Sequence, residues 1–201
     1  MTRQQTRIFT VFAAFLAGLV LSLGVILIAR EHMTAPGAPQ AAAIGGPFRL
    51  TDQDGRVVTQ EDLKGRPSLV FFGFTHCPDV CPTTLFDISQ IMAVLGPDAD
   101  RTRAVFITVD PERDTPGVLK EYAQAFGANL AGWSFLTGPP ATIRDVTRRY
   151  GIYASKSDNG DVKHTFLTSI IDPQGILRVQ YLGARFDPEE FRRDLLSLLK
   201  E

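Results

Sequence analysis

The sequence predicts an α/β domain in which helices cover a mixed β-sheet, and three observations carry this prediction. Two nearly continuous apolar runs, residues 68–74 and 103–109, are typical of strands buried on both faces. The amphipathic segment 83–95 separates them and predicts a helix that lies against the sheet. Near the carboxyl end, residues 165–171 and 176–181 flank a short turn and predict an antiparallel hairpin, which makes the sheet mixed.

A smaller hairpin is expected before the first buried strand. Residues 48–50 and 56–59 are separated by Asp-Gln-Asp-Gly at 52–55, which has the composition of a tight turn. Thr59 and Asp62 have the spacing of a capping pair, so a short turn of helix is predicted after this hairpin.

The helix after the central strand has an apolar face and a defined start. Four apolar side chains share one face at helical spacing: Leu85, Ile88, Met92 and Leu95. Proline is favoured at the first helical position, so Pro82 is expected there, with Cys81 near the N-cap and residues 77–80 in a loop. Both cysteines then lie near the positive end of the helix dipole, which favours the thiolate.

The remaining elements complete the pattern. Helices are predicted at 115–126, at about 142–150 and, after an N-cap at Asp187, to residue 200, while 152–156 has the character of a strand. This order matches a thioredoxin-like fold with additions. Because the central strand ends at Phe74, the loop that follows lies where open α/β sheets place their functional sites.

Composition excludes some classes of function. The chain has 201 residues, 44% hydrophobic and 21% charged, as expected for one globular domain with a small additional segment. Of the 21 basic residues, Arg3, Arg7 and Arg30 precede the first acidic residue, so the rest of the chain carries 22 acidic side chains against 18 basic ones. Phosphate binding needs clustered positive charge, so nucleic acid is not expected as a partner.

A membrane anchor is predicted at residues 8–28. These 21 residues carry no charge, and as a helix they would extend over about 31 Å, enough to span a bilayer. A cleaved signal peptide is the alternative, but its apolar core usually has only about 7–15 residues. Arg3 and Arg7 are expected to stay in the cytoplasm, although Arg30 and His32 weaken this charge bias.

The predicted organisation therefore has four parts. They are a cytoplasmic N-terminus at 1–7, the transmembrane anchor at 8–28, a flexible linker at 29–46 and the thioredoxin-like domain at 47–201. The short N-terminus lacks the character of an organellar transit peptide. A bacterial cell membrane is therefore favoured, with the C-terminal domain in the periplasm.

Cys77 and Cys81 are the only cysteines, and they follow the predicted central strand directly. In an oxidising compartment a close cysteine pair is disulfide-bonded, redox-active or metal-bound. A structural disulfide across so short a loop would constrain the unfolded chain little. A thioredoxin-type dithiol has two residues between its cysteines, whereas three separate these, which gives the sulfurs room to straddle a metal.

His164 offers a third type of ligand. It lies after a predicted turn and just before the strand at 165–171, on a loop that can fold over the cysteines. Alone, such a histidine is more often a surface or hydrogen-bonded residue, but two thiolates and one imidazole make a trigonal copper site. Zinc is the second choice, because structural zinc usually takes four protein ligands and only His76 and Asp79 lie nearby.

These residues resemble the Sco (SenC) family, copper-binding assembly factors for cytochrome c oxidase. The most specific match is Phe-Gly-Phe-Thr-His-Cys-Pro-Asp-Val-Cys-Pro-Thr at 72–83. Supporting matches lie at 109–116, at His164 with Thr165 and at 171–175, and the resemblance covers about residues 46–200. A membrane anchor also belongs to the family pattern.

The resemblance implies that Cys77, Cys81 and His164 bind one copper ion, as Cu(I) or Cu(II). The protein would be a membrane-anchored copper chaperone rather than an enzyme, with a possible thiol-disulfide reductase activity of the cysteine pair. Its partners would be cytochrome c oxidase subunit II, whose CuA centre it helps to assemble by copper donation, cysteine reduction or both, and other copper chaperones. Family members often carry an acidic residue before the histidine, where this chain has Lys163, and a positive charge there disfavours Cu(II).

Several alternatives stay open at the level of the sequence. A membrane-anchored thiol-disulfide oxidoreductase or redox sensor would use the cysteine pair without needing His164. A peroxidase is less favoured because the cysteines are so close, and a scaffold with a structural disulfide would resist reduction. Residues 110–114 either orient the site, dock a partner or form a solvated turn, His76 and Asp79 either tune the thiols or are incidental, and Trp133 is interpreted as packing.

Overall fold

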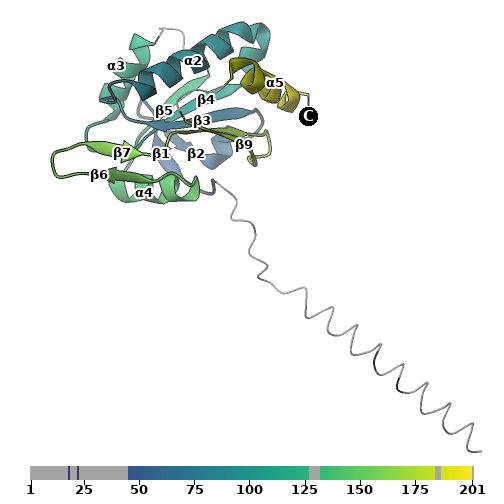
Figure 1. Cartoon of the computed structure of the whole chain (residues 1–201), viewed down its shortest axis with the longest axis horizontal. Helices are drawn as coiled ribbons and strands as arrows, with labels where there is room; N and C mark the ends of the chain where they lie inside the picture. Colours follow the sequence, from purple (N-terminus) through teal and green to yellow (C-terminus); the bar gives the residue numbers. More distant parts are fainter. Residues whose placement is uncertain (1–17, 19–21, 23–44, 127–131, 184–186, 201) are drawn as a thin grey trace, which may run out of the picture. The chain divides into compact units, whose positions relative to one another are not determined.

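The computed structural model contains a five-stranded mixed sheet in the order β5-β4-β3-β8-β9 (Figure 1). Its strands are β3 (Ser68–Gly73), β4 (Arg103–Thr108), β5 (Trp133–Leu136), β8 (Leu167–Ile171) and β9 (Leu177–Leu182). β3 and β5 run parallel to β4, whereas β8 is antiparallel to both β3 and β9. The predictions of a mixed sheet, a central strand at 68–74 and a C-terminal hairpin are confirmed.

The structure describes residues 18, 22, 45–126, 132–183 and 187–200. The chain divides into two units, Met1–Gln40 and Ala41–Glu201. In the first unit only Gly18 and Ser22 are described, and both are helical and exposed. The predicted anchor at 8–28 and most of the predicted linker at 29–46 therefore lie outside the described residues. Among those that are described, no helix has the length and hydrophobicity needed to cross a bilayer.

Helices cover both faces of the sheet (Figure 1). One face packs against α2 (Val80–Val94), α3 (Pro116–Ala125) and α5 (Pro188–Leu198). The other face packs against α4 (Pro140–Arg149) and the hairpin of β1 (Arg49–Thr51) and β2 (Val57–Thr59). β3 alternates between these two cores, because Leu69 and Phe71 face one and Val70 and Phe72 the other. The central strand is thus buried on both faces, as its apolar run predicts.

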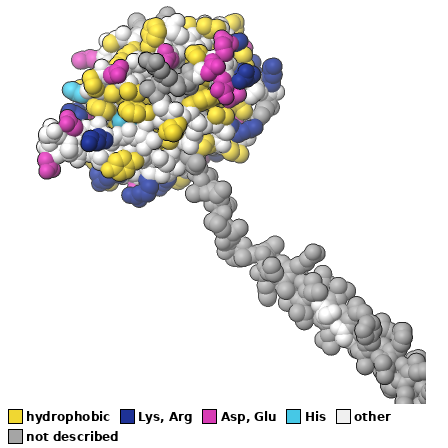
Figure 2. Space-filling view, viewed as in Figure 1, with side chains coloured by type: hydrophobic (Ala, Val, Ile, Leu, Met, Phe, Trp, Pro, Cys, Tyr) yellow, Lys and Arg dark blue, Asp and Glu magenta, His cyan; other side chains and the backbone are white. Residues whose placement is uncertain are grey.

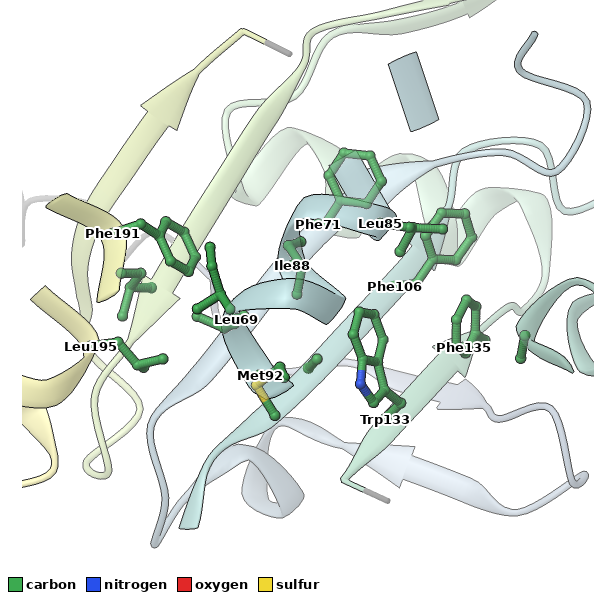
Figure 3. Close-up of a cluster of buried hydrophobic side chains, with 14 of the residues drawn as sticks. Leu69, Phe71, Leu85, Ile88, Met92, Phe106, Trp133, Phe135, Phe191 and Leu195 are labelled. Carbon is green, nitrogen blue, oxygen red and sulfur yellow. The ribbon is translucent and has the colours of Figure 1, made fainter. Parts of the chain in front are cut away.

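The larger core holds α2 against the strands that position the cysteines. Figure 3 shows Leu85, Ile88 and Met92 of α2 among aromatic side chains of the sheet. Phe106 and Phe135 have ring centroids 5.3 Å apart. Trp133 stacks on Phe135 at 5.9 Å and is 9% exposed, in agreement with its interpretation as a packing residue. This packing fixes the start of α2 relative to the end of β3.

Local capping follows the sequence closely in two places. Thr59 and Asp62 form the reciprocal bonds of a capping box at the 3₁₀ turn η1 (Gln60–Leu63). The Asp187 side chain accepts a hydrogen bond from the backbone N–H of Glu189 at the start of α5. Both predicted caps are confirmed.

The start of α2 differs from the prediction. The helix begins at Val80, so Cys81 is its second residue and Pro82 its third, and Asp79 takes the N-cap position. Proline is tolerated there because the first four N–H groups of a helix have no intrahelical partner, and the first such bond runs from the Thr83 N–H to the Asp79 carbonyl at 3.2 Å. The prediction that Pro82 is the first helical residue was therefore wrong.

Two short strands differ as well. His164 was expected on a loop, but it ends β7 (Val162–His164), which pairs with β6 (Ala154–Lys156) in a separate two-stranded sheet. β5 was not predicted. Strands this short show no clear apolar alternation, and β1, β2 and β6, which are equally short, were predicted from their turn residues and composition instead.

Charged and apolar side chains are mixed on the surface. Figure 2 shows acidic, basic and hydrophobic side chains interspersed over one face of the domain. The large hydrophobic side chains that are exposed are spread over the domain, with two of them on α2: Val57, Phe86, Val94, Tyr153, Ile176 and Leu182. Single exposed apolar residues of this kind are ordinary on soluble domains.

Candidate metal centre

The two cysteines lie where β3 ends and α2 begins. The backbone N–H of Cys77 donates to the carbonyl of Phe74 at 3.2 Å, which folds the chain back after the strand. The N–H of Cys81, in the first turn of α2, points at the Cys77 Sγ atom at 3.4 Å. Cys77 is half-buried and Cys81 is fully buried, and both are free thiols. The pair is therefore asymmetric, because Cys81 is fully buried whereas Cys77 packs against the core and stays partly exposed.

Gly73 makes room for the buried sulfur. A Cβ atom at this position would lie 2.9 Å from the Cys81 Sγ atom and 2.9 Å from the Phe106 ring. Such distances are shorter than any real Cβ contact, and both neighbours are themselves buried. The last residue of β3 must therefore be glycine for Cys81 to sit against the strand.

His164 completes the cluster from the other side. Its Nε2 atom lies 4.0 Å from the Cys81 Sγ atom, although the two residues are 83 positions apart. Its Nδ1 atom lies 3.0 Å from the Thr165 carbonyl, which can only accept, so Nδ1 carries the proton and Nε2 presents its lone pair to the sulfur. The ring is 8% exposed and packs edge-on against Phe74 and Phe166 at 5.8 and 4.5 Å. A metal-binding histidine is commonly oriented by such a bond from its other nitrogen.

Burial keeps both partners of this contact neutral. It raises the pKa of the Cys81 thiol, and the adjacent Cys77 thiol raises it further. It also lowers the pKa of His164, against a smaller opposite effect of the Thr165 carbonyl. The helix dipole, expected to favour the thiolate, is outweighed by desolvation at Cys81. Because Nε2 carries no proton, the Cys81 S–H is the group that can donate across this 4.0 Å contact.

The donor set fits a thiophilic metal after a small adjustment. Bonds of about 2.3 Å to sulfur and about 2.0 Å to nitrogen, the lengths that zinc adopts, place two donors about 3.7 Å apart at a trigonal angle. Cys81 and His164 are thus a few tenths of an ångström too far apart. Within the described residues, no three His, Cys, Asp or Glu side chains converge closely enough to bind an ion without moving. Two sulfurs and one imidazole suit copper or zinc, and no carboxylate joins them.

Asp114 anchors the cysteine loop to the neighbouring strand. This fully buried carboxylate accepts hydrogen bonds from the Thr75 N–H at 3.1 Å and from the Thr75 hydroxyl at 2.6 Å. It also accepts one from the Thr108 hydroxyl, at the end of β4, at 2.6 Å. Of the roles considered for residues 110–114, orientation of the site is the one that these contacts support.

The other polar residues near the cysteines lie outside the cluster. His76 is exposed, and its Nδ1 atom shares a hydrogen bond with the Thr75 hydroxyl at 3.0 Å. Asp79 is exposed and contacts α2 through its backbone carbonyl. Lys163 is exposed, and because side chains alternate along a strand it points away from the face that His164 presents to Cys81.

Tyr122 of α3 is a neighbour of the site that the sequence did not reveal. Its hydroxyl is buried without a hydrogen-bond partner among the described residues. Burial raises its pKa, and the nearby Cys81, Cys77 and Asp114 raise it further. A tyrosine on the apolar face of an amphipathic helix carries no signal that distinguishes it from ordinary core.

The chain is similar in sequence to known proteins. The family model described as SCO1/SenC matches residues 36–200. The SCO2-like protein RP587 of Rickettsia prowazekii is 44% identical over 138 residues, which cover 66% of this chain and 66% of that protein, just under two thirds of its length.

Solved structures agree with the sequence match. The structure of Bradyrhizobium japonicum ScoI with copper bound is 46% identical and has a TM-score of 0.70, covering 78% of this chain and 99% of that one. BsSco, described as a member of the Sco family of cytochrome c oxidase assembly proteins with a disulfide switch, is 28% identical with a TM-score of 0.68, covering 77% of this chain and 92% of that one. The extent of the family match and the copper-bound relative lead to one conclusion: the chain belongs to the SCO1/SenC family.

Proposed function

We propose that this chain binds one copper ion through Cys77, Cys81 and His164 and delivers it during assembly of the CuA centre in cytochrome c oxidase subunit II. The observation that carries the proposal is the approach of the His164 Nε2 atom to the buried Cys81 sulfur beside a second free thiol. Support comes from the copper bound to ScoI and from the assembly role stated for BsSco.

The unequal burial of the ligands suggests an order of transfer. Cys81 and His164 hold copper from the core side, whereas Cys77 is partly exposed and faces incoming groups. A thiolate of the target protein reaches the metal beside Cys77 and displaces it first. Cys81 and His164 then leave in turn, and the Cys81 sulfur recovers its proton.

We also propose that the domain works at a membrane surface. Residues 8–28 would anchor it in a bacterial cell membrane with the domain in the periplasm, and residues 29–46 would serve as a tether. Tethering raises the effective concentration of the domain near a membrane-bound oxidase subunit, so that a weak docking contact suffices.

A thiol-disulfide oxidoreductase is the second candidate. One specific observation favours it, the pairing of an accessible thiol at Cys77 with a buried one at Cys81. The disulfide switch stated for BsSco points in the same direction. In this reading Cys77 attacks a disulfide of the target, Cys81 resolves the mixed disulfide, and the target is reduced as the pair is oxidised.

Transfer to a purified CuA domain separates the two functions. Full-length chain in detergent, half of it loaded with Cu(I) and half with Cu(II), is mixed with the metal-free, reduced CuA domain, and the absorption of the mixed-valence purple centre is followed. The copper-free reduced chain is mixed in parallel with the disulfide form of the CuA domain. The thiols that appear on the CuA domain itself are counted by alkylation and mass spectrometry, because the exchange leaves the total number of thiols unchanged. If the protein delivers copper, the His164→Ala variant should fail in the first reaction. If it is an oxidoreductase, the His164→Ala variant should carry out the second reaction as well as the unmodified chain does.

Copper affinity is expected to rise with pH. Metal binding displaces the Cys81 proton, and burial raises the pKa of this thiol, so the proton must be removed throughout the neutral range. The lowered pKa of His164 keeps the imidazole neutral above about pH 6.5, so it releases none. Competition titrations with a chelator between about pH 6.5 and 8.5 should show at least a tenfold gain per pH unit. A flat profile would show that Cys81 is not a ligand.

A further inference from the structure

The β6–β7 hairpin carries His164 and lies outside the central sheet. In the described part of the chain, β6 and β7 pair only with each other and with no strand of the central sheet. On one side β6 borders a cleft of about 380 Å³, shared with α4 and the loop after β4, rather than packed core. Figure 1 shows the hairpin as a separate ribbon beside α4. The position of His164 therefore depends on the packing of Val162 and of its own ring against the core, together with a few polar contacts of the hairpin.

Lys156 makes one of these contacts. Its ammonium group lies 2.8 Å from the Asp110 Oδ1 atom and 2.8 Å from the Glu112 Oε2 atom, both in the loop after β4. Lys156 faces Val162 across the hairpin, two ladder positions from the Ala154–His164 pair. Asp110 is itself 2% exposed, and its other oxygen accepts from the Arg113 guanidinium. This ion-pair cluster ties the hairpin to a rigid part of the fold.

The same loop also holds the cysteine segment. Asp114 binds Thr75, two residues before Cys77, as described above. Arg113, held by Asp110, lies over the Phe74 ring at 6.0 Å, and Phe74 packs edge-on against the His164 ring. Residues 110–114 thus contact both segments that supply ligands. Asp114 contacts the cysteine segment, and Asp110 and Glu112 contact Lys156 of the hairpin.

We propose that Lys156 is a positioning residue for the third metal ligand. Its ion pairs with Asp110 and Glu112 latch the hairpin so that His164 stays within reach of Cys81. The inference rests on the proposed function, since His164 is taken as a ligand. If these ion pairs opened, the imidazole could withdraw while both sulfurs stayed in place. The site would then have two thiolate ligands instead of three ligands.

The test compares Lys156→Met with the unmodified full-length chain in detergent. Cu(I) affinity, measured by competition with a chromophoric chelator, should fall about tenfold, at the lower end of what loss of a ligand-orienting partner costs. Hydrogen exchange in residues 154–164 of the metal-free protein should become several times faster. Lys156→Arg, which keeps the charge, should restore most of both properties.

The decisive arm repeats the substitution in the His164→Ala background. If Lys156 acts through the imidazole, adding Lys156→Met there should change affinity less than about twofold. An equal tenfold loss in both backgrounds, or no loss in either, would overturn the proposal. Lys64→Met is the matched control. Lys64 also forms an ion pair, at 2.7 Å with Glu61, but it precedes the N-terminal end of β3, whereas the cysteines follow the C-terminal end.

The exchange measurement keeps the two proposals separate. If His164→Ala alone leaves copper binding unchanged, the three-ligand site fails. Faster hydrogen exchange of the hairpin in the metal-free Lys156→Met protein would still show that the Lys156 ion pairs hold the hairpin in place. Unchanged exchange would overturn the latch even if His164 proves to be a ligand.

Discussion

Replacement of His164 by alanine is expected to lower the copper affinity of the protein by more than about a hundredfold, because loss of partners that merely orient a ligand already costs about 10–100-fold. The imidazole is the one nitrogen donor that the described structure brings to the buried sulfur. Thiolate-to-Cu(II) charge-transfer bands and the nitrogen hyperfine pattern in EPR should disappear together. A titration monitored by both spectra measures the effect.

His76→Ala is the matched control for this variant. His76 also lies within a few residues of the cysteines, but its ring is exposed and contacts Thr75 rather than a sulfur. We expect it to bind copper as the unmodified chain does. Comparable losses in the two variants would contradict the assignment of His164, and retained binding in both would leave a site built from the cysteines alone.

Replacement of Asp114 by alanine is expected to produce the largest loss of stability at the site. Three buried or half-buried donors, the Thr75 N–H and the Thr75 and Thr108 hydroxyls, would lose their shared acceptor. Hydrogen bonds to a charged group contribute about 1.5–3 kcal/mol each, so the free energy of unfolding should fall by about 3 kcal/mol or more. Urea denaturation measures this, and the melting temperature should fall by roughly 6–12 °C.

Two further variants show whether the carboxylate itself is responsible. Asp114→Asn keeps the shape and one acceptor oxygen, so it should recover only part of the loss. Asp100→Ala, at an exposed side chain of the 3₁₀ segment Gly96–Arg101, should change stability by less than about 0.5 kcal/mol. If Asp114→Ala proved as stable as Asp100→Ala, the cysteine loop would have to be held by other contacts.

The sequence predicted the architecture well because its strongest signals are long and periodic. The two-sided burial of the central strand follows from an unbroken apolar run, and α2 from its repeating apolar face. Two short strands escaped detection. β5 and β7 have four and three residues, and the pairing that stabilises them is contributed by other parts of the chain.

The site was predictable in composition but not in its supporting contacts. The spacing of Cys77 and Cys81 indicated a reactive or metal-binding pair, whereas His164 entered the prediction through the family resemblance. The role of Asp114 depends on a bond to a residue 39 positions away, which no local pattern encodes. The start of α2 was misplaced because a rule about proline in helix interiors was applied to the first turn, where it does not hold.

The antiparallel pairing of β8 with β3 has a consequence for the maturation of the protein. Because the two strands run in opposite directions, the chain enters β8 at the edge of the sheet where it leaves β3, and His164 arrives there just before β8 begins. A chain whose sheet is incomplete offers two sulfurs four residues apart, but no imidazole beside them. Tight copper binding would then require a completely folded domain, so that only folded protein would deliver copper.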